Sequence, residues 1–182
     1  IKPKLMELLG YADLTENNIY FIEKDELNLV GTSEQSIAAM YQDEVLDEVP
    51  RRFVGYSTCF RREAGSYGRD LKGILRVHQF DKAELFSFCH PDNSSQEHEL
   101  LIKIEERIMQ SLELPYRVVL LCGGDLAKPS ATTVDIESWL PSEGKYRETH
   151  SSSNCTDYQS RGLNIRYRTP EGKLDYVHTL NG

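Results

Sequence analysis

The stretch Cys59–Glu84, CFRREAGSYGRDLKGILRVHQFDKAE, predicts two β-strands joined by a loop rich in Gly, Arg, Asp and Lys. Side chains alternate between the two faces of a strand, so Arg61 and Glu63 are expected to share one face. On the returning strand, alternation gathers polar and aromatic residues on one face: Arg76, His78, Phe80, Lys82 and Glu84. Such a face is poorly suited to a hydrophobic core. Because arginine neutralises phosphate and aromatic rings stack on bases, the hairpin indicates a surface that binds a polyphosphate and a planar group.

Parts of this stretch also have an ordinary structural explanation. An Arg and a Glu two residues apart on a strand often form a charge-paired surface, and Phe80 taken alone suits core packing. The loop favours a ligand, because glycines let the backbone approach it closely and basic side chains supply positive charge. These loop residues are Gly65, Gly68, Gly73, Arg69 and Lys72.

The same stretch resembles motif 2 of the class II aminoacyl-tRNA synthetases, in the form found in seryl-tRNA synthetases. The signature F-R-x-E is matched from Phe60 to Glu63, and the returning R-V-H-Q-F-x-K-x-E is matched from Arg76 to Glu84. The resemblance implies that Arg61 binds the α-phosphate of ATP and the carboxylate of serine. It also implies that Glu63 meets the adenine amino group.

The returning strand carries further implied roles. By resemblance, Phe80 stacks on adenine, and Arg76 and Val77 lie at the ATP site. Glu84 is implied in the serine pocket and in binding Mg²⁺, and together with Arg61 it is the expected catalytic pair. The loop from Ala64 to Gly73 is implied to lie near the phosphate tail of ATP and the acceptor end of tRNA.

A second stretch, Leu29–Glu34, is an apolar strand end followed by Thr-x-Glu. By itself this pattern also fits a helix start, with Thr32 as N-cap and an acidic residue in the first turn. In seryl-tRNA synthetases a T-x-E at this place lines the amino-acid pocket, which implies that Thr32 and Glu34 face the ammonium group of serine. Hydroxyl and carboxylate groups are suitable partners for an ammonium group.

A third stretch, from Tyr146 to Gln159, resembles the family run E-x-S-S-x-S-N-x-x-D-x-Q. The resemblance implies that Glu148 reaches the metal site of ATP and that Ser151 lies close to the adenylate. A Ser-rich stretch also fits a flexible loop, but its strand-like beginning and its Glu, Asn, Asp and Gln favour the site. The sequence departs from the family at His150 and at Arg161-Gly162.

The final residues, Thr179-Leu180-Asn181-Gly182, resemble the family's T-L-N-G and imply that Asn181 lies near bound serine. The family continues there into motif 3, and the sequence begins at or after the end of motif 1, which builds the dimer interface. The helical arm that recognises serine tRNA is also missing. We therefore expect residues 1–182 to form a single, partial catalytic domain that is not a competent enzyme by itself.

Composition agrees with a globular protein. The chain has 182 residues, 39% hydrophobic and 27% charged, and its net charge of -8 argues against non-specific nucleic-acid binding. The basic residues are nevertheless bunched, which predicts a local cationic cleft from Arg51 and Arg52 to Arg76. The four cysteines form no C-x-x-C pair, which favours reduced thiols over the alternative of a zinc site, and reduced thiols indicate a cytoplasmic protein. No apolar run is long enough to cross a membrane, and Ile1 to Gly10 is no secretory signal.

The pattern of elements predicts an α+β fold, a largely antiparallel sheet flanked by helices as in class II synthetase cores. Strands are expected at 52–62, 76–89, 118–122, 131–140, 163–169 and 173–180. Helices are expected at 33–46 and from a capping box at Ser94 and Glu97 to Leu114. A short hairpin is expected at 19–30 and another around Pro170-Glu171-Gly172.

The predicted function is ATP-dependent activation of serine to seryl-adenylate and transfer to the 3′ end of serine tRNA, within a longer enzyme. The implied partners are serine, ATP with Mg²⁺, and serine tRNA, with a homodimer as the full-length form and no membrane. Two alternatives stay open at this point. One is a truncated ATP-binding domain without turnover, and the other is an amino acid:carrier-protein ligase of the same family.

Overall fold

The structure is a computed structural model that describes residues 1–11, 18–64 and 75–182. The predicted loop cations and glycines at 65–74 lie outside the described residues. The elements, in chain order, are α1 (Pro3–Leu8), β1 (Phe21–Ile22), β2 (Leu27–Asn28), α3 (Glu34–Ala39), β3 (Val45–Leu46), β4 (Arg51–Phe60), β5 (Gln79–Cys89), α4 (Ser94–Ser111), β6 (Tyr116–Leu120), β7 (Thr132–Leu140), β8 (Lys145–Asn154), α5 (Tyr158–Leu163), β9 (Arg166–Arg168), β10 (Leu174–Tyr176) and β11 (His178–Asn181). A single 3₁₀ turn, Pro91–Asn93, leads into α4.

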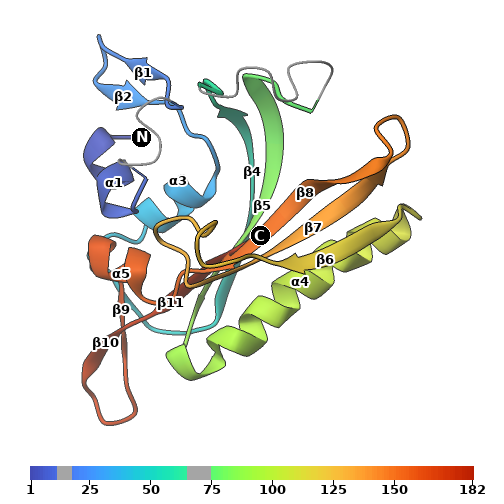
Figure 1. The fold of residues 1–182 in the computed structure, drawn as a ribbon. Coiled ribbons are helices and arrows are strands. Elements are labelled where there is room, and N and C mark those ends of the chain that lie inside the picture. The colour runs from blue at the N-terminus through green and yellow to red at the C-terminus, as the bar shows by residue number, and fades with distance from the viewer. Residues whose placement is uncertain (12–17, 65–74) are drawn as a thin grey trace.

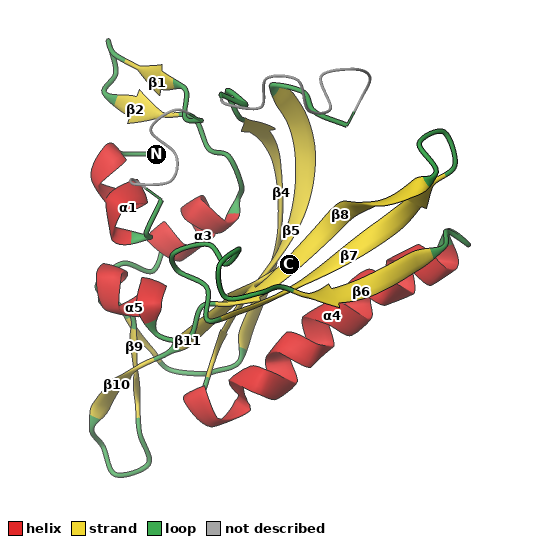
Figure 2. Cartoon of the chain, in the orientation of Figure 1, coloured by secondary structure: helices red, strands yellow, loops and turns green. Residues whose placement is uncertain are grey.

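The main sheet has six antiparallel strands in the order β4-β5-β11-β8-β7-β6. The long helix α4 lies along one face of this sheet, and the short helices α1, α3 and α5 gather at the end of the other face (Figure 1). The predicted α+β, largely antiparallel fold is confirmed. Figure 2 shows that the long strands and α4 dominate the molecule, while the remaining helices are short.

The pleat of β5 separates two sets of contacts. Phe86 and Phe88 point into a core formed with Ile37, Leu163 and other apolar residues of the short helices. Leu85 and Cys89 lie on the opposite face and pack with Leu101 of α4 and with Leu180. The face that carries Phe86 and Phe88 continues outward as Glu84, Lys82 and Phe80. One half of this face is therefore core, and the other half is free to bind a ligand.

The structure corrects several predicted boundaries. Strand β4 ends at Phe60, before the expected Arg62, because the Arg62 amide donates to the Asn18 carbonyl and Glu63 takes a left-handed φ of 52°. The predicted helix 33–46 covers only Glu34–Ala39, because the chain turns at Asp43, where φ is 63°. The hairpins at 19–30 and 170–172 are confirmed, with shorter strands.

The predicted capping box of α4 is wrong. The N-cap is Asn93, and it makes no side-chain capping bond. Glu97 instead accepts hydrogen bonds from Arg52 Nε at 2.6 Å and Nη2 at 2.8 Å, and from Ser87 Oγ at 2.8 Å. These bonds tie α4 to β4 and β5, and the Arg52 guanidinium is the first cause of the lowered pKa of Glu97. Arg52 therefore lies on the α4 face and does not belong to the predicted cationic cleft.

The C-terminal half also differs from expectation in its details. Residues 158–163 form α5, so the strand expected at 163–169 is reduced to β9. The strand expected at 173–180 divides at Val177, since β10 pairs with β9 and β11 joins the main sheet. No helix among the described residues is long and apolar enough to cross a membrane. The cysteines are free thiols, three of them buried and Cys122 exposed.

Candidate active site

Two carboxylates and a threonine hydroxyl meet where α3 packs against β5. Glu84 is 1% exposed, Glu34 3% and Thr32 6%. Thr32 Oγ1 donates to Glu84 Oε2 at 2.7 Å, and Lys82 forms an ion pair with the same carboxylate. The Lys82 ammonium also donates to Thr32 Oγ1 at 3.3 Å. The explanation of Thr32 as a helix N-cap is wrong, since Ser33 occupies that position and the Thr32 hydroxyl is bound to Glu84.

Glu34 is held by residues from distant parts of the chain. Its Oε1 accepts from Tyr11 Oη at 2.7 Å and from Gln159 Nε2 at 2.5 Å. Burial raises the pKa of Glu34, and the negative charge of Glu84 acts in the same direction, while both hydrogen bonds and Lys82 lower it. A buried carboxylate is costly unless it is hydrogen-bonded, so these donors stabilise its charged form.

The two residues predicted to contact ATP most closely lie against each other. The guanidinium carbon of Arg61 lies 5.2 Å from the centroid of the Phe80 ring. Arg61 Nε also donates to the Gly31 carbonyl at 3.2 Å, next to Thr32. The structure thus places Arg61 and Phe80 next to the cluster of Thr32, Glu34 and Glu84. The distance and orientation suit a cation–π contact.

Glu63 and Arg76 form an ion pair at the loop end of the β4–β5 hairpin. Glu63 lies beyond the end of β4, and Arg76 and Val77 lie in the exposed segment before β5. His78 is also exposed, and its Nδ1 contacts the Arg61 carbonyl oxygen at 3.2 Å. The predicted alternation is therefore confirmed for Phe80, Lys82 and Glu84 within β5, while Arg76 and His78 precede the strand.

A β-bulge in β8 places Glu148 and Ser151 on the same face. The pairing with β7 shifts between Ile136 and Glu137, so Ile136 pairs with His150 while Glu137 pairs with Glu148 and Thr149 is the extra residue. Without the bulge, residues three apart in a strand would point to opposite faces. The hydrogen bonds of Thr149 to Ser138 and Ile136 fix the bulge.

The bulge brings the side-chain oxygens of Glu148, Ser151 and Asp135 to the same face of the sheet. Asp135 pairs directly with Ser151, and a hydrogen bond from Ser151 acts on its carboxylate. The Glu148 side chain is accessible to solvent, yet partial desolvation and the charge of Asp135 raise its pKa, against the effect of Arg61 and Arg76. These two arginines therefore lie close enough to Glu148 to belong to one electrostatic site.

The predicted metal ligands Glu84 and Glu148 lie on strands that are not neighbours in the sheet. Strand β11 separates β5, which carries Glu84, from β8, which carries Glu148, and Glu84 is already engaged by Lys82 and Thr32. In the described ranges no group of three or more His, Cys, Asp or Glu side chains is arranged to hold a metal ion. Oxygen donors such as Glu148 and Ser151 do suit Mg²⁺, which also takes ligands from phosphate groups.

Asn181, predicted near serine, lies on β11, between β5 and β8. It pairs with Ser153 of β8 and Phe86 of β5, and it is 8% exposed. The Nδ2 atom of Asn181 lies 3.9 Å from the sulfur of Cys155. Burial raises the pKa of the Cys155 thiol, and the charge of Glu34 acts in the same direction. Asn181 therefore borders the Glu34 side of the site.

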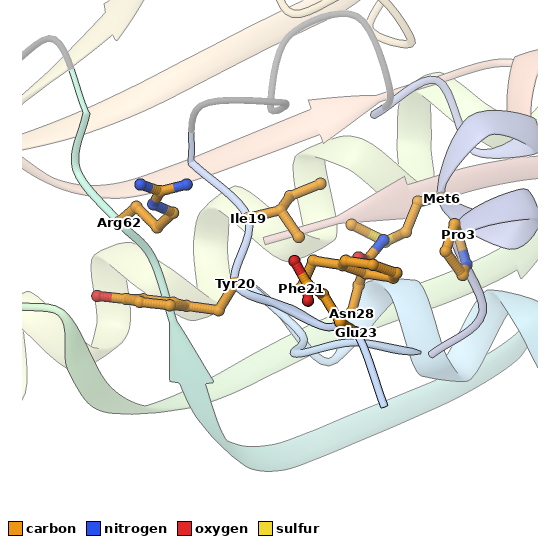
Figure 3. A pocket seen from close by; sticks show the side chains of 8 residues that line it. All are labelled: Pro3, Met6, Ile19, Tyr20, Phe21, Glu23, Asn28 and Arg62. Atoms are coloured by element: carbon orange, nitrogen blue, oxygen red, sulfur yellow. The ribbon is translucent and has the colours of Figure 1, made fainter. Parts of the chain in front are cut away.

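Two cavities adjoin the site. The larger, of about 590 Å³, lies between α1 and the β1–β2 hairpin and includes none of the predicted site residues (Figure 3). The smaller, of about 190 Å³, includes Thr32, Arg61, Gly31 and Tyr11 in its lining. Figure 3 shows Arg62 at one side of the larger cavity and Pro3 and Met6 at the other. The smaller cavity thus touches the predicted residues Thr32 and Arg61, while Glu34 and Glu84 are in the lining of neither cavity.

Sequence analysis missed several residues of the site. Lys82 was placed on the binding face but received no role, and Gln159 was noted only as part of the third stretch. Thr179 was noted only as part of the final T-L-N-G stretch. Tyr11 and Asp135 carry no local signal, because each joins the site through contacts with distant segments.

Comparison with known proteins identifies the family. Residues 19–182 match the tRNA synthetase class II core domain (G, H, P, S and T). The chain belongs to this family.

Individual relatives narrow the similarity further. The serine–tRNA ligase of Thermobifida fusca is 49% identical over 184 aligned residues, which cover 100% of this chain and 44% of that protein. The solved structure of seryl-tRNA synthetase from Pyrococcus horikoshii, complexed with ATP, superposes with a TM-score of 0.95 at 46% identity, covering 100% of this chain and 41% of the other. The cytoplasmic serine–tRNA ligase of Naegleria fowleri, in complex with AMP, gives 0.91 at 37% identity, covering 100% of this chain and 44% of the other. This chain thus spans less than half the length of these relatives.

Proposed function

We propose that this chain is the central part of a catalytic domain that activates serine with ATP and transfers it to serine tRNA. The observation that carries the proposal is the buried cluster of Thr32, Glu34 and Glu84 beside Arg61, in a chain similar over its whole length to serine–tRNA ligases. A cluster of two carboxylates and a hydroxyl group next to an arginine suits an amino acid that carries an ammonium, a carboxylate and a hydroxyl group.

The first step is attack of the serine carboxylate on the α-phosphate of ATP, with pyrophosphate leaving. This step depends on positioning and charge neutralisation. Arg61 draws the carboxylate and the α-phosphate together, Phe80 stacks on the adenine, and Glu63 accepts from its amino group. Glu84 and Glu148 are the residues proposed to hold Mg²⁺, which would offset the charge of the phosphates, and Ser151 is proposed to lie close to the adenylate. In the second step a hydroxyl group at the 3′ end of the tRNA attacks the carbonyl of seryl-adenylate, the seryl ester forms, and AMP leaves.

Selectivity for serine over alanine follows from the polar groups of the pocket. When serine binds, its hydroxyl and ammonium groups form hydrogen bonds with Thr32, Glu34 and Glu84. Alanine has no side-chain hydroxyl group, so one of these hydrogen bonds would be missing in its complex. A homodimer, a role for Asn181 at the serine and a cytoplasmic location complete the proposal. The homodimer and the role of Asn181 rest on the family resemblance of the sequence, and the cytoplasmic location rests on the expectation of reduced cysteines.

The test is serine-dependent pyrophosphate exchange in the complete protein. Arg61→Ala is expected to lower the exchange rate on the order of 10²-fold or more, because a preorganised cation at the α-phosphate is lost. Arg62→Ala is the matched control, since Arg62 is exposed and adjoins the larger cavity instead. Unchanged exchange in Arg61→Ala would contradict the role of Arg61.

Absence of exchange in the unaltered complete protein would favour an ATP-binding domain without turnover. Exchange with transfer of serine to a carrier protein, and none to tRNA, would favour the carrier-protein ligase.

A further inference from the structure

Glu34 owes its position to a chain of buried hydrogen bonds that starts well away from α3. Tyr11 follows α1, Gln159 lies in α5, and the two contacts to Glu34 span 23 and 125 residues of sequence. In the described part of the molecule, both hydrogen bonds meet the same oxygen, Oε1. Tyr11 and Gln159 therefore hold one oxygen of the Glu34 carboxylate in common.

The direction of the Gln159 amide is also determined. Thr179 Oγ1 donates to Gln159 Oε1 at 2.7 Å, and both residues are 0% exposed. An amide whose oxygen accepts from Thr179 must present its NH₂ group on the other side, which is the side of Glu34. Thr179 therefore sets the orientation of Gln159, and Gln159 in turn sets that of Glu34.

Tyr11 is suited to the same task. Burial raises the pKa of its phenol, and the charge of Glu34 acts in the same direction, so the phenol stays neutral and donates its proton. The other carboxylate of the cluster, Glu84, has separate donors in Thr32 and Lys82. The two carboxylates thus accept hydrogen bonds from different donors, while the charge of Lys82 acts on both.

We infer that Tyr11 and Gln159 are positioning residues that hold Glu34 Oε1, so that Oε2 recognises the α-ammonium group of the amino-acid substrate. The inference rests on the proposed function, which assigns the ammonium group to Glu34. It adds two residues that act on the substrate only through Glu34, and it gives the segments around α1 and α5 a role beside the β4–β5 hairpin.

The test compares two ligands that differ only in the ammonium group. These are 5′-O-[N-(L-seryl)sulfamoyl]adenosine and its analogue with a 3-hydroxypropanoyl group, measured by calorimetry with Mg²⁺ on the complete protein. The Kd of the analogue without the ammonium group, divided by the Kd of the seryl compound, measures how strongly the protein recognises the ammonium group. Tyr11→Phe and Gln159→Met are each expected to reduce this ratio by about tenfold, the effect of one hydrogen bond to a charged group. The Kd of the analogue without ammonium should change little.

Tyr158→Phe is the matched control. It removes a phenol hydroxyl one residue before Gln159, where the Tyr158 ring packs against Gly10, and it should leave both Kd values unchanged. In a Glu34→Gln background, Tyr11→Phe should have no further effect on the ratio, because the residue through which it acts is already lost.

Equal weakening of both ligands in Tyr11→Phe and Gln159→Met would overturn the inference, because it would show a purely structural role. A ratio unaffected by either substitution would overturn it as well. If the unaltered protein binds neither ligand, the proposed function fails first and the inference fails with it. If it binds both tightly and only the variants behave otherwise than expected, the proposed function stands and the inference alone is wrong.

Discussion

Glu105 is a residue whose environment favours the neutral form. Both of its carboxylate oxygens are buried without a hydrogen bond among the described residues, and the carboxylate faces Gly182 and Ser152 under the sheet. Burial is the main cause that raises the pKa of Glu105 from 4.5 to about 8, and the charges of Glu84 and Asp135 add to it. Between pH 4.5 and about pH 8, Glu105 is therefore protonated in the folded chain and ionised in the unfolded chain.

This difference predicts how stability depends on pH. The contribution of protonated Glu105 to the stability of the folded chain is fully present below pH 4.5 and is lost as the pH rises to about 8. The free energy of unfolding should therefore fall over this interval. Glu105→Gln should remove this part of the dependence and unfold at higher urea concentration than the parent at neutral pH. Urea unfolding of the 182-residue chain at a series of pH values measures it.

Glu99→Gln, on the exposed side of the same helix, is the control for that experiment. If the parent and Glu105→Gln show the same slope of unfolding free energy against pH, Glu105 is ionised in the folded chain and the expectation is wrong.

At the scale of elements, helices α1 and α5 pack with their backbones in contact at Gly162. A Cβ added at this position would lie 2.1 Å from the Leu8 carbonyl oxygen. These two helices carry or precede the residues that hold Glu34, since Gln159 lies in α5 and Tyr11 follows α1. Their close approach therefore bears on the site as well as on stability.

Gly162→Ala should lower the free energy of unfolding by about 1–3 kcal/mol, because the backbones must move apart. Chemical unfolding of the chain measures this change. Gly124→Ala serves as control, since no atom lies within 4 Å of the added Cβ. An equal, small effect of both substitutions would show that α1 and α5 separate without cost.

The bulge in β8 shows how an element can convert a sequence spacing into a site. Glu148 and Ser151 stand three apart, which an ordinary strand would place on opposite faces. The family resemblance predicted a shared site for them, and only the extra residue Thr149 makes this geometry possible. The bulge lies beside the proposed site, a location where bulges are frequent.

At the scale of the whole molecule, the described residues bring the three resembling stretches together on one face of the sheet. This predicts that the 182-residue chain binds an acyl-adenylate by itself. The seryl-sulfamoyl analogue with Mg²⁺ should raise the midpoint of thermal unfolding, because a ligand that binds only the folded state stabilises it. Differential scanning calorimetry measures the shift.

Arg61→Ala should abolish that shift, whereas Arg62→Ala should keep it. A shift in the complete protein but none in this chain would contradict the prediction, and would show that segments outside residues 1–182 are needed to assemble the site.

Much of the fold follows from local patterns. The alternation in β5 predicted the shared face of Phe80, Lys82 and Glu84, and helical spacing predicted α4. The ends of the elements were predicted less well, as at Phe60 and Val177, because they depend on hydrogen-bond partners elsewhere in the chain. The capping box at Ser94 failed for the same reason, since Glu97 binds Arg52 of a distant strand.

The sequence by itself determined the family, the hairpin of the binding face and the residues proposed to contact ATP and serine, because these depend on residue types at fixed local spacings. Only the tertiary structure decided what holds Glu34 and Glu84. Gln159 meets Glu34 across 125 residues, and Thr32 meets Glu84 across 52, through the packing of helices on the sheet. Contacts of this kind depend on strand order and helix placement, which no local pattern of side chains specifies.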